Sequence, residues 1–354
     1  MTSATLPRNN FGLIRLLAAW LVLFSHSYHL TGSGGAEPLM LLSGGKMTFG
    51  TLAVGVFFSI SGYLITASAY TRPGLAVFLQ ARVRRIFPAL ILVVVLSALV
   101  LGVAMSTLTP NEYFARPKVW TYIARNISLL RLQYDLPGVF AATPYGPAVN
   151  GSLWTLPIEF ALYLAVGGTV WTLRQLRRQD ALWLPLLLAA AVCFVCWGLV
   201  LRGSQSGAAL LVPYFMLGAV CRIARRHLPM HGTIATALAL ALVAVVYADS
   251  SLFPVAASLT ISYGTLWIAR HEHWIAPLDL SRVGDLSYGI YLFAFPLQQT
   301  VIALGLADGP LALCLAASAL TLPAAWLCWH GLEQHFVDVA PVSPPRHPEL
   351  VEGQ

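Results

Sequence analysis

Long runs of apolar residues, separated by short polar segments, follow one another along almost the whole chain. Each run approaches the roughly 20 residues that a helix needs to cross the hydrocarbon core of a bilayer. We therefore predict an all-α fold, a polytopic transmembrane helix bundle with about ten spans. The predicted spans cover residues 11–30, 52–70, 86–108, 153–173, 181–201, 207–222, 232–248, 251–270, 284–306 and 311–332. The sixth run is short. If the seventh and eighth runs formed one span, the number of spans would be odd and not even.

The composition agrees with a membrane bundle and not with a soluble domain. Of the 354 residues, 58% are apolar and 10% are charged, whereas about a quarter of a soluble domain is charged. We predict one transmembrane domain at residues 1–337 and a disordered, polar, proline-rich cytoplasmic tail at 338–354. The net charge of +7 does not indicate nucleic-acid binding, because the basic residues form short clusters between the apolar runs.

The distribution of basic residues predicts the orientation of the bundle, because Lys and Arg near span ends accumulate in the cytoplasm. With the N-terminus inside, 14 of the 21 Lys and Arg residues fall on the cytoplasmic side, six fall outside, and Arg15 lies within the first span. Both termini are therefore expected in the cytoplasm. The chain is expected to be a multi-pass protein of the cell's inner (cytoplasmic) membrane.

A long connection at 109–152 mixes aromatic and basic residues on the predicted outer side. Two interpretations are equally open for it. One is a short amphipathic helix along the membrane interface, as part of an outer substrate site, and the other is a solvated connection.

The five cysteines do not indicate a disulfide framework, a redox centre or a metal site. Cys193 and Cys196 form a C-x-x-C pair, but they lie in an apolar run without a second ligand pair. We interpret the cysteines as small apolar packing residues, and we predict no metal ligands.

Arg15 and His26 are ionisable residues inside the first predicted span, where such residues are costly and by default mark function. Their spacing puts them within about 20° of one helix face and about 16 Å apart along the axis. Arg15 is expected near the cytoplasmic end and His26 towards the outer end. The alternative for His26 is a structural, hydrogen-bonded histidine, and the face shared with Arg15 argues against it.

Glu159 lies near the start of the fourth predicted span, which enters from the outer side. We expect it about 9 Å deep, similar to the roughly 6 Å expected for His26. A carboxylate beside a histidine raises its basicity and stabilises the imidazolium ion, so a catalytic pair is a reasonable hypothesis. The competing interpretation is a structural ion pair between Glu159 and an arginine.

Two further segments are ambiguous by themselves. Arg82 and Arg85 lie three residues apart, ahead of the third predicted span, and their guanidinium groups suit phosphate. A basic cluster in that place is also typical of a cytoplasmic anchor. Ser61 and Gly62 leave room for a ligand in the second span, but small residues there equally permit close helix packing.

Taken together and in order, these motifs resemble the acyltransferase-3 family of integral membrane acyltransferases over nearly the whole chain. The similar segments are Arg15 to His26, FFSISGYLI, Arg82-x-x-Arg85 followed by IFPAL, GSLWTLPIE, DLSYGIYLFAFPL and GLEQHF. The chain departs from the family pattern after Glu333. Members of the family commonly have a proline soon after this glutamate, whereas here Gln334 and then His335 and Phe336 follow.

The resemblance implies transfer of an acyl group, most often acetyl, from cytoplasmic acyl-CoA to a hydroxyl of an extracytoplasmic carbohydrate such as O-antigen or exopolysaccharide. Acyl-CoA would be a donor substrate, with no permanently bound cofactor; membrane lipid and the glycan are the other expected partners, and the oligomeric state stays open. His26 would act as general base or carry the acyl group. The candidate residues are His26, Glu159 and Arg15 for catalysis, Arg82, Arg85, Ser61 and Gly62 for the donor, and Trp154, Tyr288 and Glu333 in supporting roles.

A secondary transporter or flippase is the main alternative, since it also places ionisable residues in broken helices. The sequence contains no inverted repeat that would support it. A membrane scaffold is a third possibility, and the cost of Arg15, His26 and Glu159 in lipid argues against it.

Overall fold

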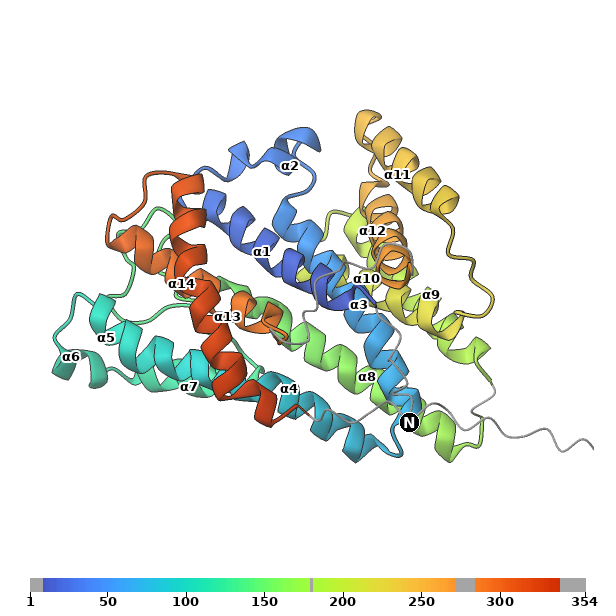
Figure 1. Cartoon of the computed structure of the whole chain (residues 1–354), viewed down its shortest axis with the longest axis horizontal. Coiled ribbons are helices and arrows are strands. Elements are labelled where there is room, and N and C mark those ends of the chain that lie inside the picture. The colour runs from blue at the N-terminus through green and yellow to red at the C-terminus, as the bar shows by residue number, and fades with distance from the viewer. Residues whose placement is uncertain (1–8, 179–180, 272–283, 338–354) are drawn as a thin grey trace, which may run out of the picture.

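The computed structural model describes residues 9–178, 181–271 and 284–337 (Figure 1). These residues form helices and no β-strand, which confirms the all-α prediction. The long helices are α1 (Phe11–Leu30), α3 (Phe49–Thr71), α4 (Leu75–Leu96), α8 (Thr155–Gln175), α9 (Trp183–Leu201), α10 (Gly207–Ile223), α11 (Gly232–Tyr247), α12 (Phe253–Arg270), α13 (Ser287–Ala303) and α14 (Pro310–Gly331). The short helices are α2 (Pro38–Leu42), α5 (Gly102–Met105), α6 (Pro110–Phe114) and α7 (Pro117–Ser128).

Each long helix in the described residues overlaps one of the predicted apolar runs. Six helical segments there are long and apolar enough to cross a membrane, and α10 and α11 are shorter apolar helices. The six are Phe11–Leu30, Phe49–Thr71, Leu75–Met105, Gly151–Gln175, Trp183–Leu201 and Pro310–His335. These segments indicate a membrane protein, and the count of about ten spans stays a prediction. The predicted tail at 338–354 lies outside the described residues.

The helix α4 begins at Leu75, well before the expected start at residue 86. Arg82 and Arg85 consequently lie within the helix and not ahead of it. The apolar pattern misses this start because the first turns of α4 mix apolar and basic residues, and arginine is a good helix former. The helix continues through a π-helical turn at Ser97–Leu101 into α5.

The helix α3 lies in the middle of the bundle and packs against α1, α8, α10 and α12 (Figure 1). Its contact with α10 is close enough to require glycine on both sides. A Cβ atom on Gly62 would lie 1.9 Å from the carbonyl oxygen of Phe215, and one on Gly218 would lie 2.1 Å from that of Ser59. Small residues that bring two backbones together are typical of helix pairs in membranes.

Contacts between connecting segments agree with the predicted sidedness. On the predicted outer side, Lys46 bonds to Asp249 at 2.5 Å, and this ammonium group holds the pKa of Asp249 below its usual range. On the predicted inner side, Arg174 of α8 donates to the carbonyl of Tyr70 at 2.8 Å, and the backbone N–H of Asn10 donates to Ala269 at 3.1 Å. Each contact joins segments assigned to the same side. The cytoplasmic location of the termini stays a prediction.

The long connection at 109–152 contains the amphipathic helix α7, packed along α4. Its Val119 and Tyr122 are buried, whereas Trp120 and Arg125 are exposed. The predicted amphipathic helix therefore exists, and its position at a membrane interface stays a prediction.

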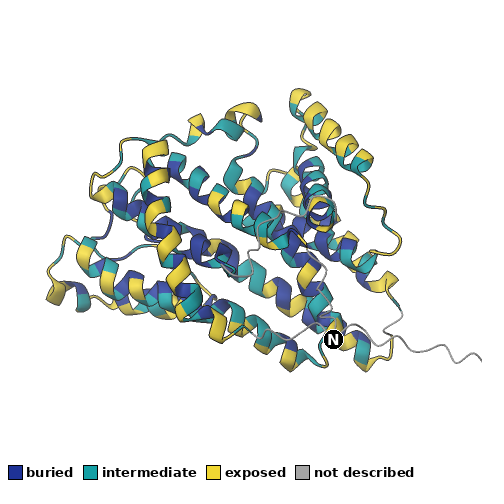
Figure 2. Ribbon diagram, in the orientation of Figure 1, coloured by how far each residue is buried: buried dark blue, intermediate teal, exposed yellow. Residues whose placement is uncertain are grey.

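The outward faces of the outer helices are exposed (Figure 2), and many of the exposed side chains on them are large and apolar. Phe194 of α9 is 77% exposed and Leu315 of α14 is 72% exposed. Large exposed apolar surfaces mark interaction with another apolar phase, and here the surrounding lipid is that phase.

Candidate active site

A polar cavity of about 60 Å³ lies between α1, α3, α8 and α13. We call it the inner cavity, and its polar lining residues include Arg15, Ser61, Glu159, Tyr288 and Tyr291. Glu159 is oriented from two sides, because Oε1 accepts a hydrogen bond from Ser61 Oγ at 3.0 Å and another from the hydroxyl of Tyr163. A carboxylate held in this way keeps one orientation towards the cavity.

Asp285 connects the two arginines that the sequence placed at the same end of the bundle. Its Oδ2 atom accepts from Arg15 Nη1 at 2.7 Å and from Arg85 Nη2 at 2.6 Å, and Ser287 donates to Oδ1 at 2.5 Å. The other terminal nitrogen of Arg85 bonds to Glu333 Oε2 at 3.0 Å. The structure thus forms an ionic network between α1, α4 and the segments flanking α13 and α14.

Aromatic rings hold Arg85 on two further sides. Its guanidinium carbon lies 5.6 Å from the ring centroid of Tyr288 and 5.5 Å from that of Trp329, within the range of cation–π attraction. The hydroxyl of Tyr288 donates to the carbonyl of Ile86 at 3.0 Å, which fixes this ring against α4.

Arg82 and Arg85 therefore differ, although both were predicted to bind phosphate. Both terminal nitrogens of Arg85 bond to carboxylates, so its observed contacts are those of a structural ion pair, which neither the phosphate-binding nor the anchor interpretation predicted. Arg82 lies 5.8 Å from the ring of Phe78, and its buried Nε has no hydrogen-bond partner. Of the two, Arg82 retains an unused donor for an anion.

A second cavity of about 190 Å³ lies on the side of the bundle where α1 ends. We call it the outer cavity; its lining includes Ser25, His26, His29, Ser152 and Trp154. The ring of His26 meets Phe295 edge to face at 5.4 Å, and its buried Nδ1 has no hydrogen-bond partner. The hydroxyls of Ser25 and Ser152 are buried without partners as well. Unsatisfied polar atoms around one cavity are typical of a site for a polar ligand.

His26 and Glu159 do not contact each other as the hypothesis of a catalytic pair requires. No hydrogen bond joins them among the described residues, and they line different cavities. The sequence gives their depths along two helix axes but not the directions in which the side chains point. Glu159 points towards Ser61 on α3, and His26 towards Phe295 on α13.

Tyr291 and Val54 line both cavities and thus form a common wall. The Tyr291 hydroxyl donates to the carbonyl of Ser152 at 2.8 Å and lies 2.7 Å from the hydroxyl of Thr155. These bonds tie α13 to the start of α8. The wall is formed by one aromatic side chain and one small apolar side chain.

The remaining candidates have distinct positions. Trp154 lines the outer cavity, and its ring leaves no space for a Cβ atom on Gly207 of α10. Gly62 lines neither cavity, and its close approach to Phe215 favours the helix-packing interpretation of this residue. Glu333 is 2% exposed and has Arg85 as its charged partner.

The sequence matches the acyltransferase domain of the acyltransferase-3 type over residues 8–330. The chain belongs to the acyltransferase-3 family. It is 30% identical to an "O-acetyl transferase" of Shigella phage Sf6, over 93% of this chain and 96% of that protein. It is 28% identical to "Nodulation protein 10" of Rhizobium leguminosarum bv. viciae, over 92% of each chain. No solved structure matches it.

Membership in the acyltransferase-3 family confirms the resemblance seen in the sequence and identifies acyl transfer as the activity. Sequence reasoning for this family member missed Asp285, Tyr163 and Tyr291. Asp285 carried a usable signal, because arginines expected near the membrane need a carboxylate partner and this aspartate stands directly before an apolar run. Tyr291 lies in the same family-like segment, DLSYGIYLFAFPL, but nothing singled it out there, and Tyr163 carried no signal because aromatic residues are frequent in the spans.

Proposed function

We propose that the protein transfers an acyl group, most often acetyl, from cytoplasmic acyl-CoA to a hydroxyl of an extracytoplasmic carbohydrate. The observation that carries the proposal is the pair of cavities with a common wall at Tyr291 and Val54. One cavity contains the carboxylate of Glu159 and adjoins the arginine network, and the other contains His26. Donor and acceptor are thereby able to approach from different ends of the bundle.

Arg82 provides positive charge for the phosphates of CoA. The unused Nε donor of Arg82 suits a phosphate oxygen. Arg85 is held in place by Asp285 and Glu333, and these two carboxylates balance the charges of Arg15 and Arg85. The pantetheine arm then passes the inner cavity and carries the thioester to the wall at Tyr291.

His26 performs the proton transfer in this scheme. Its unpartnered nitrogen takes the proton of the acceptor hydroxyl while the hydroxyl oxygen attacks the thioester carbonyl. The carbon–sulfur bond breaks, the ester forms, and the CoA thiolate takes the proton from His26. Glu159, whose orientation Ser61 and Tyr163 fix, places a negative charge in the inner cavity, and this charge favours the imidazolium ion that forms on His26 across the wall.

The name of one relative supports the part of the proposal that concerns the transferred group. The phage relative is named for O-acetyl transfer, which favours acetyl as the group and oxygen as the acceptor atom. Every observation that fits a transporter fits the acyltransferase proposal equally well.

Proteoliposomes containing labelled acetyl-CoA on one side and an oligosaccharide acceptor on the other test the proposal. Replacing His26 with Ala should lower the transfer rate by a factor of about 10²–10⁴, the usual contribution of a general base. His227→Ala is the matched control, because His227 is exposed at the end of α10 and lines neither cavity.

Turnover by correctly inserted His26→Ala at the rate of His227→Ala would overturn the proposed role of His26. Acceptor flux without acetyl-CoA, and no transfer of label, would instead favour the transporter. Mass spectrometry of surface glycans from cells with and without the protein identifies the acceptor.

A further inference from the structure

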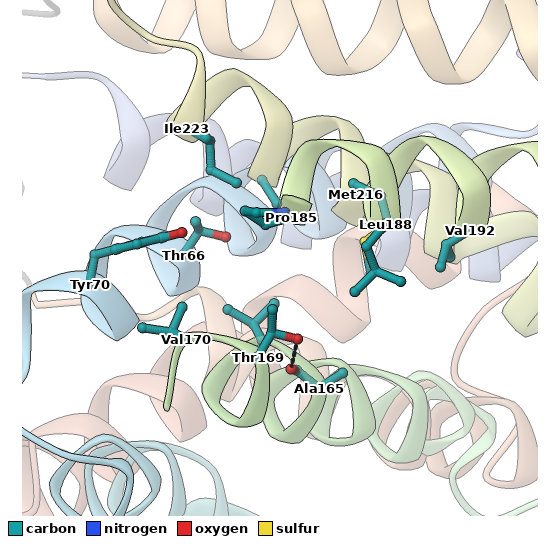
Figure 3. Close-up of a pocket in the computed structure, with 13 residues that line it drawn as sticks. Thr66, Tyr70, Ala165, Thr169, Val170, Pro185, Leu188, Val192, Met216 and Ile223 are labelled. Carbon is teal, nitrogen blue, oxygen red and sulfur yellow. Dashed lines mark hydrogen bonds between the residues drawn. The ribbon is translucent and has the colours of Figure 1, made fainter. Parts of the chain in front are cut away.

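A third cavity, of about 250 Å³, lies away from the polar site, in a cleft between α8 and α9 (Figure 3). The two helices follow each other in the chain but pack mainly on other elements, α8 on α3 and α4, and α9 on α10. Side chains from α3 and α10, among them Thr66 and Met216, form the floor of the cleft. Figure 3 shows Leu188 and Val192 on one side and Ala165 and Thr169 on the other.

The walls of this cleft are apolar, and its rim is open to the surroundings of the bundle. Val166, Val170, Val192 and Ile223 are among the lining residues. At the rim, Leu188 is 52% exposed and Ala165 is exposed. In a membrane-spanning bundle the medium outside α8 and α9 is hydrocarbon, so the cleft opens onto lipid chains.

Two hydroxyl groups inside the cleft have no hydrogen-bond partner. Thr66 is 2% exposed, and its Oγ1 atom is buried and unpaired. The hydroxyl of Tyr70, one turn further along α3, is also buried and unpaired, and Figure 3 shows it pointing towards Thr66. An unpaired hydroxyl in an apolar environment costs about 1–3 kcal/mol by mutational data, so an acceptor there would be favourable.

Positive charge stands at the same end of the cleft. The guanidinium group of Arg174 bonds to the backbone carbonyls of Ala69, Tyr70 and Arg72 at 2.6–3.2 Å. These bonds are to neutral acceptors, so the charge of Arg174 is not compensated by them. Along the cleft, an apolar body is therefore followed by two hydroxyl donors and then by a cation.

We infer that this cleft binds one acyl chain of a membrane phospholipid. The chain occupies the apolar body, its ester carbonyl accepts hydrogen bonds from Thr66 and Tyr70, and the phosphate lies towards Arg174. The cleft has room for part of the chain, because an apolar cavity of about 150 Å³ already holds the six carbons of benzene; the rest of the chain extends through the open rim into the bilayer. The site is independent of the proposed transfer reaction, since none of its lining residues lines the inner or the outer cavity.

Photolabelling of the full-length protein tests this inference without measuring acyl transfer. The protein is reconstituted in phosphatidylethanolamine vesicles with trace phosphatidylglycerol that carries a diazirine within one acyl chain. After irradiation, peptide mass spectrometry locates the adducts. We expect adducts on Met216, on the floor of the cleft, as well as on Phe194, which faces the bulk lipid.

Replacing Ala165 with Trp should block the rim and bring labelling of Met216 to background, while labelling of Phe194 stays unchanged. Ala161→Trp is the matched control, because Ala161 is exposed one turn earlier on α8 and does not line the cleft. The pair Thr66→Val with Tyr70→Phe keeps the volume and removes the donors, so it should lower the labelling of Met216 selectively.

Three results would overturn the inference. The first is no labelling of Met216 in the unmodified protein. The second is equal labelling of Met216 in the two tryptophan variants. The third is labelling of Met216 by a diazirine free fatty acid but not by the phospholipid, which would assign the cleft to a different acyl source.

Discussion

Asp285 offers the most direct test of the ionic network, because a single oxygen of its side chain joins two arginines. Replacing Asp285 with Asn removes the negative charge and keeps the size of the side chain. Arg15 and Arg85 then lose their bonds of 2.7 and 2.6 Å to a carboxylate, and two positive charges remain close together. Among the described residues, Glu333 then remains as the charged partner of Arg85.

The size of the effect follows from the environment of these groups. A hydrogen bond to a charged group contributes about 1.5–3 kcal/mol, and breaking a buried ion pair costs about 3–5 kcal/mol. Asp285 is 28% exposed and Arg85 is 19% exposed at the side chain, so solvent screens part of this interaction. We expect a loss of about 3 kcal/mol. At about 2 °C per kcal/mol for a large domain, the midpoint of thermal unfolding falls by about 6 °C.

The assay is thermal unfolding in detergent, followed at one fixed scan rate because unfolding of membrane proteins is often irreversible. Asp135→Asn is the control, since Asp135 pairs with Lys118 in a connection where both side chains are more than a third exposed. Such exposed pairs contribute about 0–1 kcal/mol, so its midpoint should move by no more than about 2 °C. Equal midpoints for the two variants would refute the reasoning. The double variant with Arg15→Gln should be less destabilised than the sum of the single changes, because each single change leaves an unpaired charge.

Two further outcomes are expected. Gly62→Ala should lower stability by about 1–3 kcal/mol through overpacking, because the new Cβ atom would meet the carbonyl of Phe215. The control Gly168→Ala has open space around the new Cβ atom and should be neutral or slightly stabilising. Equal melting temperatures for the two variants would contradict the close contact at Gly62. Tyr291→Phe should leave Thr155 and the carbonyl of Ser152 without their partner, lowering stability by about 1–3 kcal/mol. If the wall also keeps water from the thioester, acetyl-CoA hydrolysis without acceptor should rise in Tyr291→Phe, and an unchanged hydrolysis rate would argue against that role.

Much of the helical framework was predictable from the sequence, because a helix in lipid must be apolar over most of its length. The start of α4 was not predictable. The early turns of this helix include charged residues such as Arg82 and Arg85, and these lower the local hydropathy below that of a membrane span. The packing of α3 on α10 was only half predictable. The small residues were visible in the sequence, but which helix Gly62 faces depends on tertiary contacts.

The candidate site shows a similar division. The sequence identified Arg15, His26 and Glu159, because ionisable residues within apolar runs are rare. It did not predict their partners, since Asp285 follows Arg15 by 270 residues and no local pattern links them. Helical spacing gives height along one axis, whereas a contact between helices also needs the rotation of each helix about its axis. For this reason, the hypothesis of a contact between His26 and Glu159 failed although both residues line cavities with the common wall at Tyr291.

That wall has a consequence for the energetics of the membrane itself. A protein with a polar chamber at either end of a bilayer becomes an ion conduit whenever the two chambers join, and each elementary charge that crosses 100 mV dissipates about 2.3 kcal/mol. The side chains of Tyr291 and Val54 separate the chambers with a thin apolar and aromatic partition. Under the proposed reaction, a displacement of these two side chains would admit the reacting group, whereas their resting position keeps the two chambers, and any ions in them, apart.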